Sequence, residues 1–230
     1  VREGTAGVDL GYELGEWGEL RLGWHRGREK GEVVSGADVY PRQRTEHGKL
    51  RLAAVIDRLD SPFFPRRGYS ASVLGEWHDA RFGSDLDYRY AAFDAIWAAS
   101  SGPHSVLVNF LLAGSPDREL PAAGRYTLGG LFRLSGYRYG ELAADQVALG
   151  SLSYYRRINT LPEMIGRGVY LGGTVEWAAL RNYALDRPSP GNRSSLALFL
   201  GADTVLGPLY LGVAYASRVG EPRYYLLFGQ

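Results

Sequence analysis

His78 and Asp79 are neighbouring residues whose types could support acid–base chemistry. A histidine oriented by a carboxylate is a common general base in hydrolases, where it activates a nucleophile. The strained Gly-x-Ser-x-Gly turn that presents a serine nucleophile does not occur, because Arg133 rather than glycine stands two positions before Ser135. A barrel hydrolase that uses His78 and Asp79 therefore stays an alternative, and we assign no catalytic residue.

Residues that could bind a metal are few and far apart. The chain has no cysteine, and its four histidines are His25, His47, His78 and His104. Zinc sites usually place at least two Cys or His ligands a few residues apart, and thiolate sites require cysteine. We expect no metal and no cofactor.

Length and charge limit the possible class of protein. The chain has 230 residues, of which 45% are hydrophobic, and a formal net charge of +1. These values suit one domain over residues 1–230 and argue against nucleic acid as a partner. The sequence begins with Val1, without a signal peptide, and has no run of about 18 apolar residues that could form a transmembrane helix. We expect it to be a piece of a longer chain.

Hydrophobic alternation with a period of two residues runs through most of the chain and predicts β-strands. In the stretch VYLGGTVEWAA, Val175 and Trp177 fall on one face, whereas Thr174 and Glu176 fall on the other. We expect about eleven strands and no helix. The expected strands are residues 8–14, 19–25, 49–57, 69–80, 86–99, 104–113, 146–156, 169–179, 194–206, 208–218 and 223–229.

The length of these strands indicates a membrane barrel. Many run to about 10 residues, enough for a tilted strand to cross a bilayer, and their polar faces carry the Gly, Tyr, Arg and Glu expected of a barrel interior. Short connections such as EWGE and VLGP alternate with long ones such as residues 115–145. The prediction is an all-β fold, a transmembrane antiparallel up-and-down β-barrel, with a soluble all-β domain as the alternative.

Two segments have compositions that a plain hairpin turn does not need. The Pro-rich turn, residues 57–70 (DRLDSPFFPRRGYS), combines prolines that cannot donate to a sheet with a glycine suited to unusual backbone angles. The glycine-rich loop, residues 128–141 (LGGLFRLSGYRYGE), holds four glycines and two arginines. Its glycines suit a tight reversal in a crowded interior, and we expect Tyr137 and Tyr139 to pack on the wall.

These motifs resemble those of the bacterial surface antigen superfamily of outer-membrane barrels, which includes BamA, TamA and the two-partner secretion translocators. The Pro-rich turn is similar to the family's D-x-P-x-F-P-x-x-G periplasmic turn, and LFRLSGY to its sixth extracellular loop, which folds into the lumen. GGTVEWAA resembles the family strand with the F-x-D-x-G pattern. The motif residues of the turn are Asp57, Pro62, Phe64, Pro65 and Gly68.

The resemblance implies which residues face the lumen. In the loop they are Gly129, Gly130, Arg133, Ser135, Gly136, Tyr137 and Arg138. Their implied partner is Glu176, at the acidic position of the strand motif. The family's loop-tip arginine, which pairs with this acid, falls on Ser135 here. Because an unpaired buried carboxylate is costly, we expect some partner for Glu176. Either Arg133 or Arg138 could take this place; otherwise the tether is absent.

The resemblance also implies a strand count and a function. Five strands follow the loop, as in the family's sixteen-stranded barrel, so these would be the last eleven strands. LGGLFRLSGY is most like the barrels of patatin-like phospholipases, the type Vd autotransporters. The implied function is a non-enzymatic translocator or anchor in the bacterial outer membrane, with the loop as a plug or a gate. An assembly factor of the BamA or TamA kind is the alternative.

The implied partners are outer-membrane lipid, the protein's own upstream passenger and POTRA domain, and the barrel assembly machinery. Any lipase activity would belong to that passenger, because this segment has no nucleophile motif.

Overall fold

Antiparallel strands dominate the computed structural model, which describes residues 2–30, 44–116, 120, 124–162, 164–181 and 191–229. Among these residues, eleven strands form one sheet in the order β1-β2-β3-β4-β5-β6-β9-β10-β11-β12-β13. They are β1 (Arg2–Glu13), β2 (Glu19–Lys30), β3 (Arg44–Asp57), β4 (Gly68–His78), β5 (Tyr88–Ser101), β6 (His104–Gly114), β9 (Gln146–Asn159), β10 (Gly166–Arg181), β11 (Gly191–Thr204), β12 (Gly207–Ala216) and β13 (Arg223–Phe228). The all-β prediction is confirmed.

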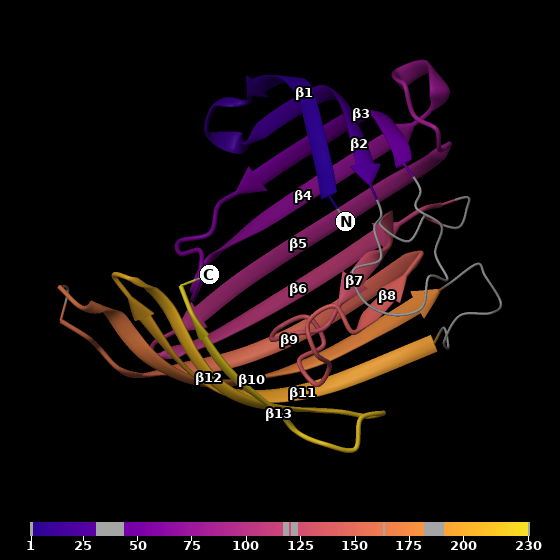
Figure 1. Cartoon of the computed structure of the whole chain (residues 1–230). Helices are drawn as coiled ribbons and strands as arrows, with labels where there is room; N and C mark the ends of the chain where they lie inside the picture. Colours follow the sequence, from indigo (N-terminus) through magenta and orange to yellow (C-terminus); the bar gives the residue numbers. More distant parts are fainter. Residues whose placement is uncertain are drawn as a thin grey trace.

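The sheet is curved, and the glycine-rich loop lies on its concave side (Figure 1). Strands adjacent in sequence are adjacent in the sheet, except that β6 pairs directly with β9. Between them, β7 (Tyr126–Leu128) and β8 (Leu142–Ala144) form a separate hairpin. The sequence did not predict this hairpin, because strands of three residues are too short to show a period of two.

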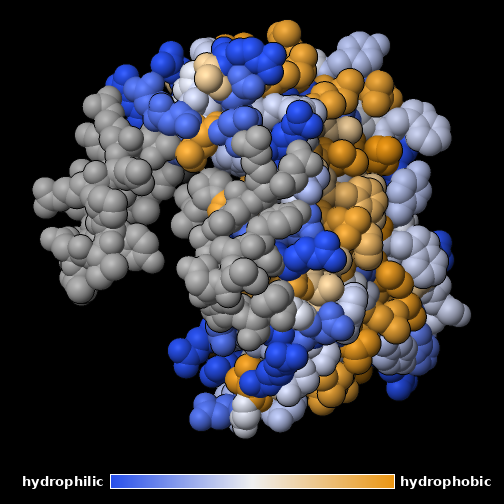
Figure 2. Space-filling model, turned by 90° about the vertical axis from the view of Figure 1, so that its right-hand side faces the viewer, coloured by the Kyte–Doolittle hydropathy of each residue, from blue (hydrophilic) through white to orange (hydrophobic). Residues whose placement is uncertain are grey.

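The two faces of the sheet differ as the alternation predicts. On β10, Thr174 and Glu176 are buried, whereas Val175 and Trp177 are about half exposed on the other face. Figure 2 shows apolar side chains, in orange, gathered along one side of the molecule. An apolar face turned outward and a polar face turned inward are the reverse of a soluble sandwich and match a strand that contacts lipid.

The two ends of the sheet differ in the length of their connections. At one end the connections are short, as at residues 14–18, 102–103 and 205–206. At the other end they are longer, as at residues 79–87 and 115–145. The Pro-rich turn lies at the short-connection end, where the Arg66 side chain donates to the Gly102 carbonyl oxygen. η1 (Gly15–Trp17) and η2 (Ala80–Phe82) are short 3-10 turns. No helix within the described ranges is both long and apolar enough for a membrane span.

Candidate functional site

The glycine-rich loop starts from a fixed base. β7 and β8 pair as far as Leu128 and Leu142, the residues that bring the chain into and out of the loop. Just after β8, the buried Asp145 carboxylate accepts a hydrogen bond from the Leu120 backbone N–H at 3.1 Å. The same carboxylate lies 3.5 Å from Arg125 Nε. These contacts to the buried carboxylate help to hold the base of the loop in the interior.

The reversal of the loop depends on glycine. Gly129 and Gly130 have φ angles of 119° and 100°, a region that residues with a Cβ rarely adopt. A Cβ on Gly129 would also lie 1.9 Å from the Arg138 carbonyl oxygen. The Gly129 N–H donates to the Arg133 carbonyl oxygen and the Gly130 N–H to that of Tyr137, both at 2.9 Å. These two bonds close the reversal.

Glu176 on β10 holds the tip of the loop. One of its carboxylate oxygens accepts the Ser135 backbone N–H at 2.6 Å, and the other accepts the Ser135 hydroxyl at 3.0 Å. Ser195, which lies opposite Glu176 on β11, hydrogen-bonds to Glu176 and accepts the Gly136 N–H at 2.6 Å. Glu176 is 3% exposed and Ser135 is fully buried. The loop tip is therefore fixed to two neighbouring strands.

Glu176 has the partner that a buried carboxylate needs, but this partner is Ser135 and neither of the two candidate arginines, Arg133 and Arg138. The guanidinium of Arg133 instead donates to the Tyr126 hydroxyl and lies 5.3 Å from the centre of its ring. Arg138 is exposed. The physical reason is that Ser135 brings two donors, one from the backbone and one from the side chain. Hydrogen bonds to a carboxylate satisfy it without a positive charge.

The apolar side chains of the loop tip pack on the inner wall, with one exception. Leu134 and Tyr137 are buried in a cluster that includes Ala178 of β10 and Ala216 of β12. Tyr139 is 91% exposed, so its predicted position on the wall is wrong. It lies beyond the tip, where the chain already turns back toward β8.

Ala197 offers a site for a reporter of loop position. The chain has no cysteine, so a single introduced thiol would be the only one within these 230 residues. Ala197 lies on β11 between Ser195 and Phe199, both of which contact the loop, and it is 1% exposed. In an Ala197→Cys protein, the rate of labelling by a membrane-impermeant maleimide should follow the fraction of molecules whose loop is open.

Tyr225 on β13 supports the tip from a third strand, because its hydroxyl donates to the carbonyl oxygens of Ser135 and Tyr137. We expect Tyr225→Phe to raise labelling at Ala197→Cys by about twofold to tenfold, since one hydrogen bond contributes about 0.5–1.5 kcal/mol. Tyr224→Phe is the matched control, because Tyr224 is 79% exposed. Equal rates in the two variants would show that the Tyr225 hydroxyl does not stabilise the loop.

The Pro-rich turn is closed by a residue outside the predicted motif set. Asp60 accepts the backbone N–H groups of Arg66 and Arg67 at 2.7 and 3.1 Å, whereas Asp57, the predicted residue, accepts that of Leu59 at 3.0 Å. Asp60 stands two positions before Pro62, where the D-x-P pattern itself has its acid.

The other predicted residues of the turn shape it and direct it inward. Gly68 has φ of 107°, and a Cβ there would lie 1.9 Å from the Arg58 carbonyl oxygen. The Pro65 carbonyl oxygen accepts the Tyr155 hydroxyl. Phe64 is 2% exposed and reaches the inner wall, and Pro62 lines the interior cavity beside it.

Besides Asp60, the site contains two residues that sequence reasoning did not single out, Ser195 and Tyr225. Ser195 falls in the inward phase of the strand predicted at 194–206, and pairing of that strand with its neighbour would have placed it opposite Glu176. Nothing in the local sequence around Tyr225 connects it to a loop about ninety residues away.

The structure does not assemble His78 and Asp79 into a catalytic pair. The His78 ring stacks on Tyr88 at 4.0 Å and its Nε2 lies 3.5 Å from Glu76. Asp79 is engaged by the Arg81 side chain, whose hydrogen bonds lower the pKa of that carboxyl to about 2. Asp79 therefore orients Arg81 rather than a histidine. The part of the chain that is described contains no group of three or more acidic, His or Cys side chains placed to hold a metal.

Together, the outward apolar face and the loop fixed inside define a class of protein, the transmembrane β-barrel with an inward-folded loop. Comparison with protein families specifies it further, because the Omp85 superfamily domain matches residues 1–217. The chain belongs to the Omp85 superfamily and is a bacterial outer-membrane barrel. The resemblance to the surface-antigen barrels is thus confirmed.

Among solved structures, the chain is similar to the crystal structure of BamA from Haemophilus ducreyi lacking POTRA domains 1-3, with a TM-score of 0.79 and 17% sequence identity. The match covers 97% of this chain and 52% of that one, so the chain spans about half the length of this relative. At this identity the likeness shows the fold. A comparison with curated protein sequences finds no match.

Proposed function

We propose that this chain is the barrel part of an outer-membrane translocator or anchor for a secreted passenger, with the glycine-rich loop as a plug. The observation that carries the proposal is the attachment of the loop tip to Glu176, Ser195 and Tyr225, on three different strands. Several hydrogen bonds keep the loop in the interior at rest. Because none of these contacts is covalent, the loop can also be released. In this proposal the segment itself performs no catalysis.

The proposed passenger is a patatin-like lipase that precedes the barrel together with a POTRA domain. Its support is the loop form LSGY, in which Ser135 replaces the family's arginine. The contacts of Ser135 favour this reading of the variant, because they give the serine a positive role as a donor to Glu176. In the same proposal the described strands are the last eleven of sixteen, and the partners are membrane lipid and the barrel assembly machinery.

Deletion of the barrel from the full-length protein in its bacterium tests this function. We expect the passenger to be cleaved by protease added to intact cells, and its surface exposure to be lost when the barrel is deleted, while other outer-membrane barrels keep their normal levels. A passenger that stays protected, with a general loss of other barrels, would overturn the proposal and favour the assembly-factor alternative. Lipase activity that stays with this segment alone would favour the hydrolase.

A further inference from the structure

A cluster of aromatic side chains fills the interior near the short-connection end. Phe64 of the Pro-rich turn stacks on Tyr170 of β10, with ring centres 4.4 Å apart and planes 8° apart. Its ring also lies 5.0 Å from that of Tyr210 on β12. Two further hydrogen bonds fix the turn to this wall, because Tyr210 donates to the Phe63 carbonyl oxygen at 3.1 Å and Tyr155 donates to that of Pro65.

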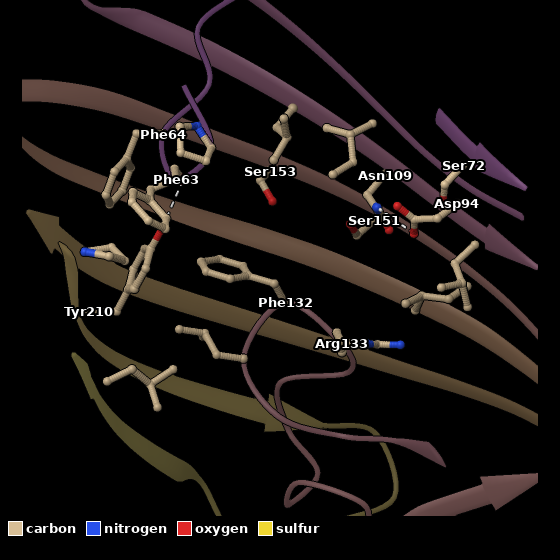
Figure 3. Close-up of a pocket in the computed structure, with 18 of the residues that line it drawn as sticks. Phe63, Phe64, Ser72, Asp94, Asn109, Phe132, Arg133, Ser151, Ser153 and Tyr210 are labelled. Atoms are coloured by element: carbon tan, nitrogen blue, oxygen red, sulfur yellow. Dashed lines mark hydrogen bonds between the residues drawn. The ribbon is translucent and has the colours of Figure 1, made fainter. Parts of the chain in front are cut away.

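The glycine-rich loop reaches the same cluster from the opposite end of the sheet. Phe132 packs edge-on against Tyr210, with ring centres 5.3 Å apart, and against Phe199 at 5.2 Å. Tyr210 therefore contacts an aromatic ring of the turn and an aromatic ring of the loop (Figure 3). We call Phe64, Tyr210 and Phe132 the aromatic bridge. It joins two segments that enter the interior from opposite sides of the membrane.

The Phe132 ring packs against Tyr210 and Phe199 on one side. Its other side lines a cavity of about 670 Å³, which is bounded farther on by small polar side chains that include Asp94, Asn109 and Ser151 (Figure 3). An aromatic ring next to open space can leave its contacts without displacing a packed neighbour. The bridge is therefore a contact that can be broken and remade.

The backbone of the loop tip is in a conformation that needs such support. Phe132 and Leu134 have φ angles of 66° and 67°, which are uncommon for residues with large side chains and persist only where surrounding contacts impose them. The Ser135 attachment to Glu176 supplies one set of contacts, and the aromatic bridge supplies the other. Loss of either set should let the tip relax toward ordinary angles.

We propose that the aromatic bridge couples the Pro-rich turn to the glycine-rich loop, so that displacement of the turn on the periplasmic side releases the loop. This regulation rests on the proposed function, because it assigns a trigger to the plug. Phe64 is then a positioning residue for the loop, acting through Tyr210. Coupling between two sites is reciprocal, so release of the loop also loosens the turn.

The first test uses full-length protein with Ala197→Cys in outer membranes. Phe64→Ala should raise maleimide labelling about tenfold, since it removes the three ring contacts that Phe64 makes with Tyr155, Tyr170 and Tyr210. Phe63→Ala, a change of the adjacent phenylalanine, should leave labelling within about twofold. A direct effect is excluded by distance: Phe64 covers Gly201, four residues and about 13 Å along β11 from Ala197. Heat-modifiable migration shows whether Phe64→Ala folds. If it does not, Phe64→Leu replaces it, because leucine keeps most of the buried volume. We expect Phe64→Leu to raise labelling at Ala197→Cys about threefold.

The second test reads the coupling in the opposite direction. Ser61 in the turn is 7% exposed, so Ser61→Cys reports on the turn. Glu176→Ala, which breaks the loop attachment at a distant point, should raise labelling at Ser61→Cys about fivefold, and Asp94→Ala should not. If Glu176→Ala exposes Ala197→Cys while Phe64→Ala does not, the bridge is overturned and the plug stands. If neither variant exposes it, the loop does not open, and the releasable plug of the proposed function is overturned together with the bridge.

Discussion

Glu176→Ala should raise maleimide labelling at Ala197→Cys about a hundredfold. The carboxylate accepts the Ser135 N–H and hydroxyl and hydrogen-bonds to Ser195, and each hydrogen bond to a charged group contributes about 1.5–3 kcal/mol. Part of this loss is offset when water reaches the freed donors, so we expect a net cost of about 3 kcal/mol to loop docking. At about 1.4 kcal/mol per tenfold, that is about two orders of magnitude.

Two further variants separate the loss of the anchor from a general effect of removing an interior acid. Asp94→Ala removes a carboxylate that lines the interior cavity beside Phe132 and accepts a hydrogen bond from Asn109; it should leave labelling unchanged. Glu176→Gln keeps one acceptor oxygen and should give an intermediate rate. An unchanged rate in Glu176→Ala would contradict the anchoring role of this residue.

The strands could be predicted from the sequence because the physical demand on each residue is local. In a lipid-facing strand, residues that point outward are apolar and residues that point inward are polar. The alternation from Val169 to Trp177 therefore predicts a strand and its two faces without information from elsewhere in the chain. The inward phase of Glu176 followed in the same way. The motif order then located the loop that contacts it.

The partner of Glu176 could not be predicted, because candidate partners for a carboxylate are sought among positively charged side chains. The two arginines are the charged candidates near this carboxylate, whereas the backbone donates through the Ser135 N–H regardless of residue type. The positive φ angles just before Ser135, at Phe132 and Leu134, direct the tip of the loop, and no composition rule gives such angles to phenylalanine or leucine. Tyr225 and the aromatic bridge depend on contacts between distant segments, which periodicity does not encode.

Gly136→Ala should open the loop about as far as loss of Glu176 does, for a steric reason. A Cβ at Gly136 would lie 2.4 Å from both the Cβ and the backbone nitrogen of Ala216 and 2.6 Å from the Tyr215 carbonyl carbon. These atoms belong to the end of β12, where Tyr215 and Ala216 pair with β11, so they cannot move aside as the far end of a flexible side chain would. Overpacking of this kind typically costs about 1–3 kcal/mol, and a rigid wall should place it near the upper value.

Gly150→Ala is the matched control, because a Cβ there meets nothing within 4 Å. Labelling at Ala197→Cys should therefore rise about a hundredfold in Gly136→Ala and stay within about twofold in Gly150→Ala. Gly136→Ala keeps the backbone N–H that donates to Ser195 and leaves Glu176 intact, so it removes the close approach and none of the donors. If it labels as slowly as the parent, the tip does not rest against β12. If both Gly136→Ala and Glu176→Ala open the loop, close contact and hydrogen bonding are each necessary, and neither alone holds the plug.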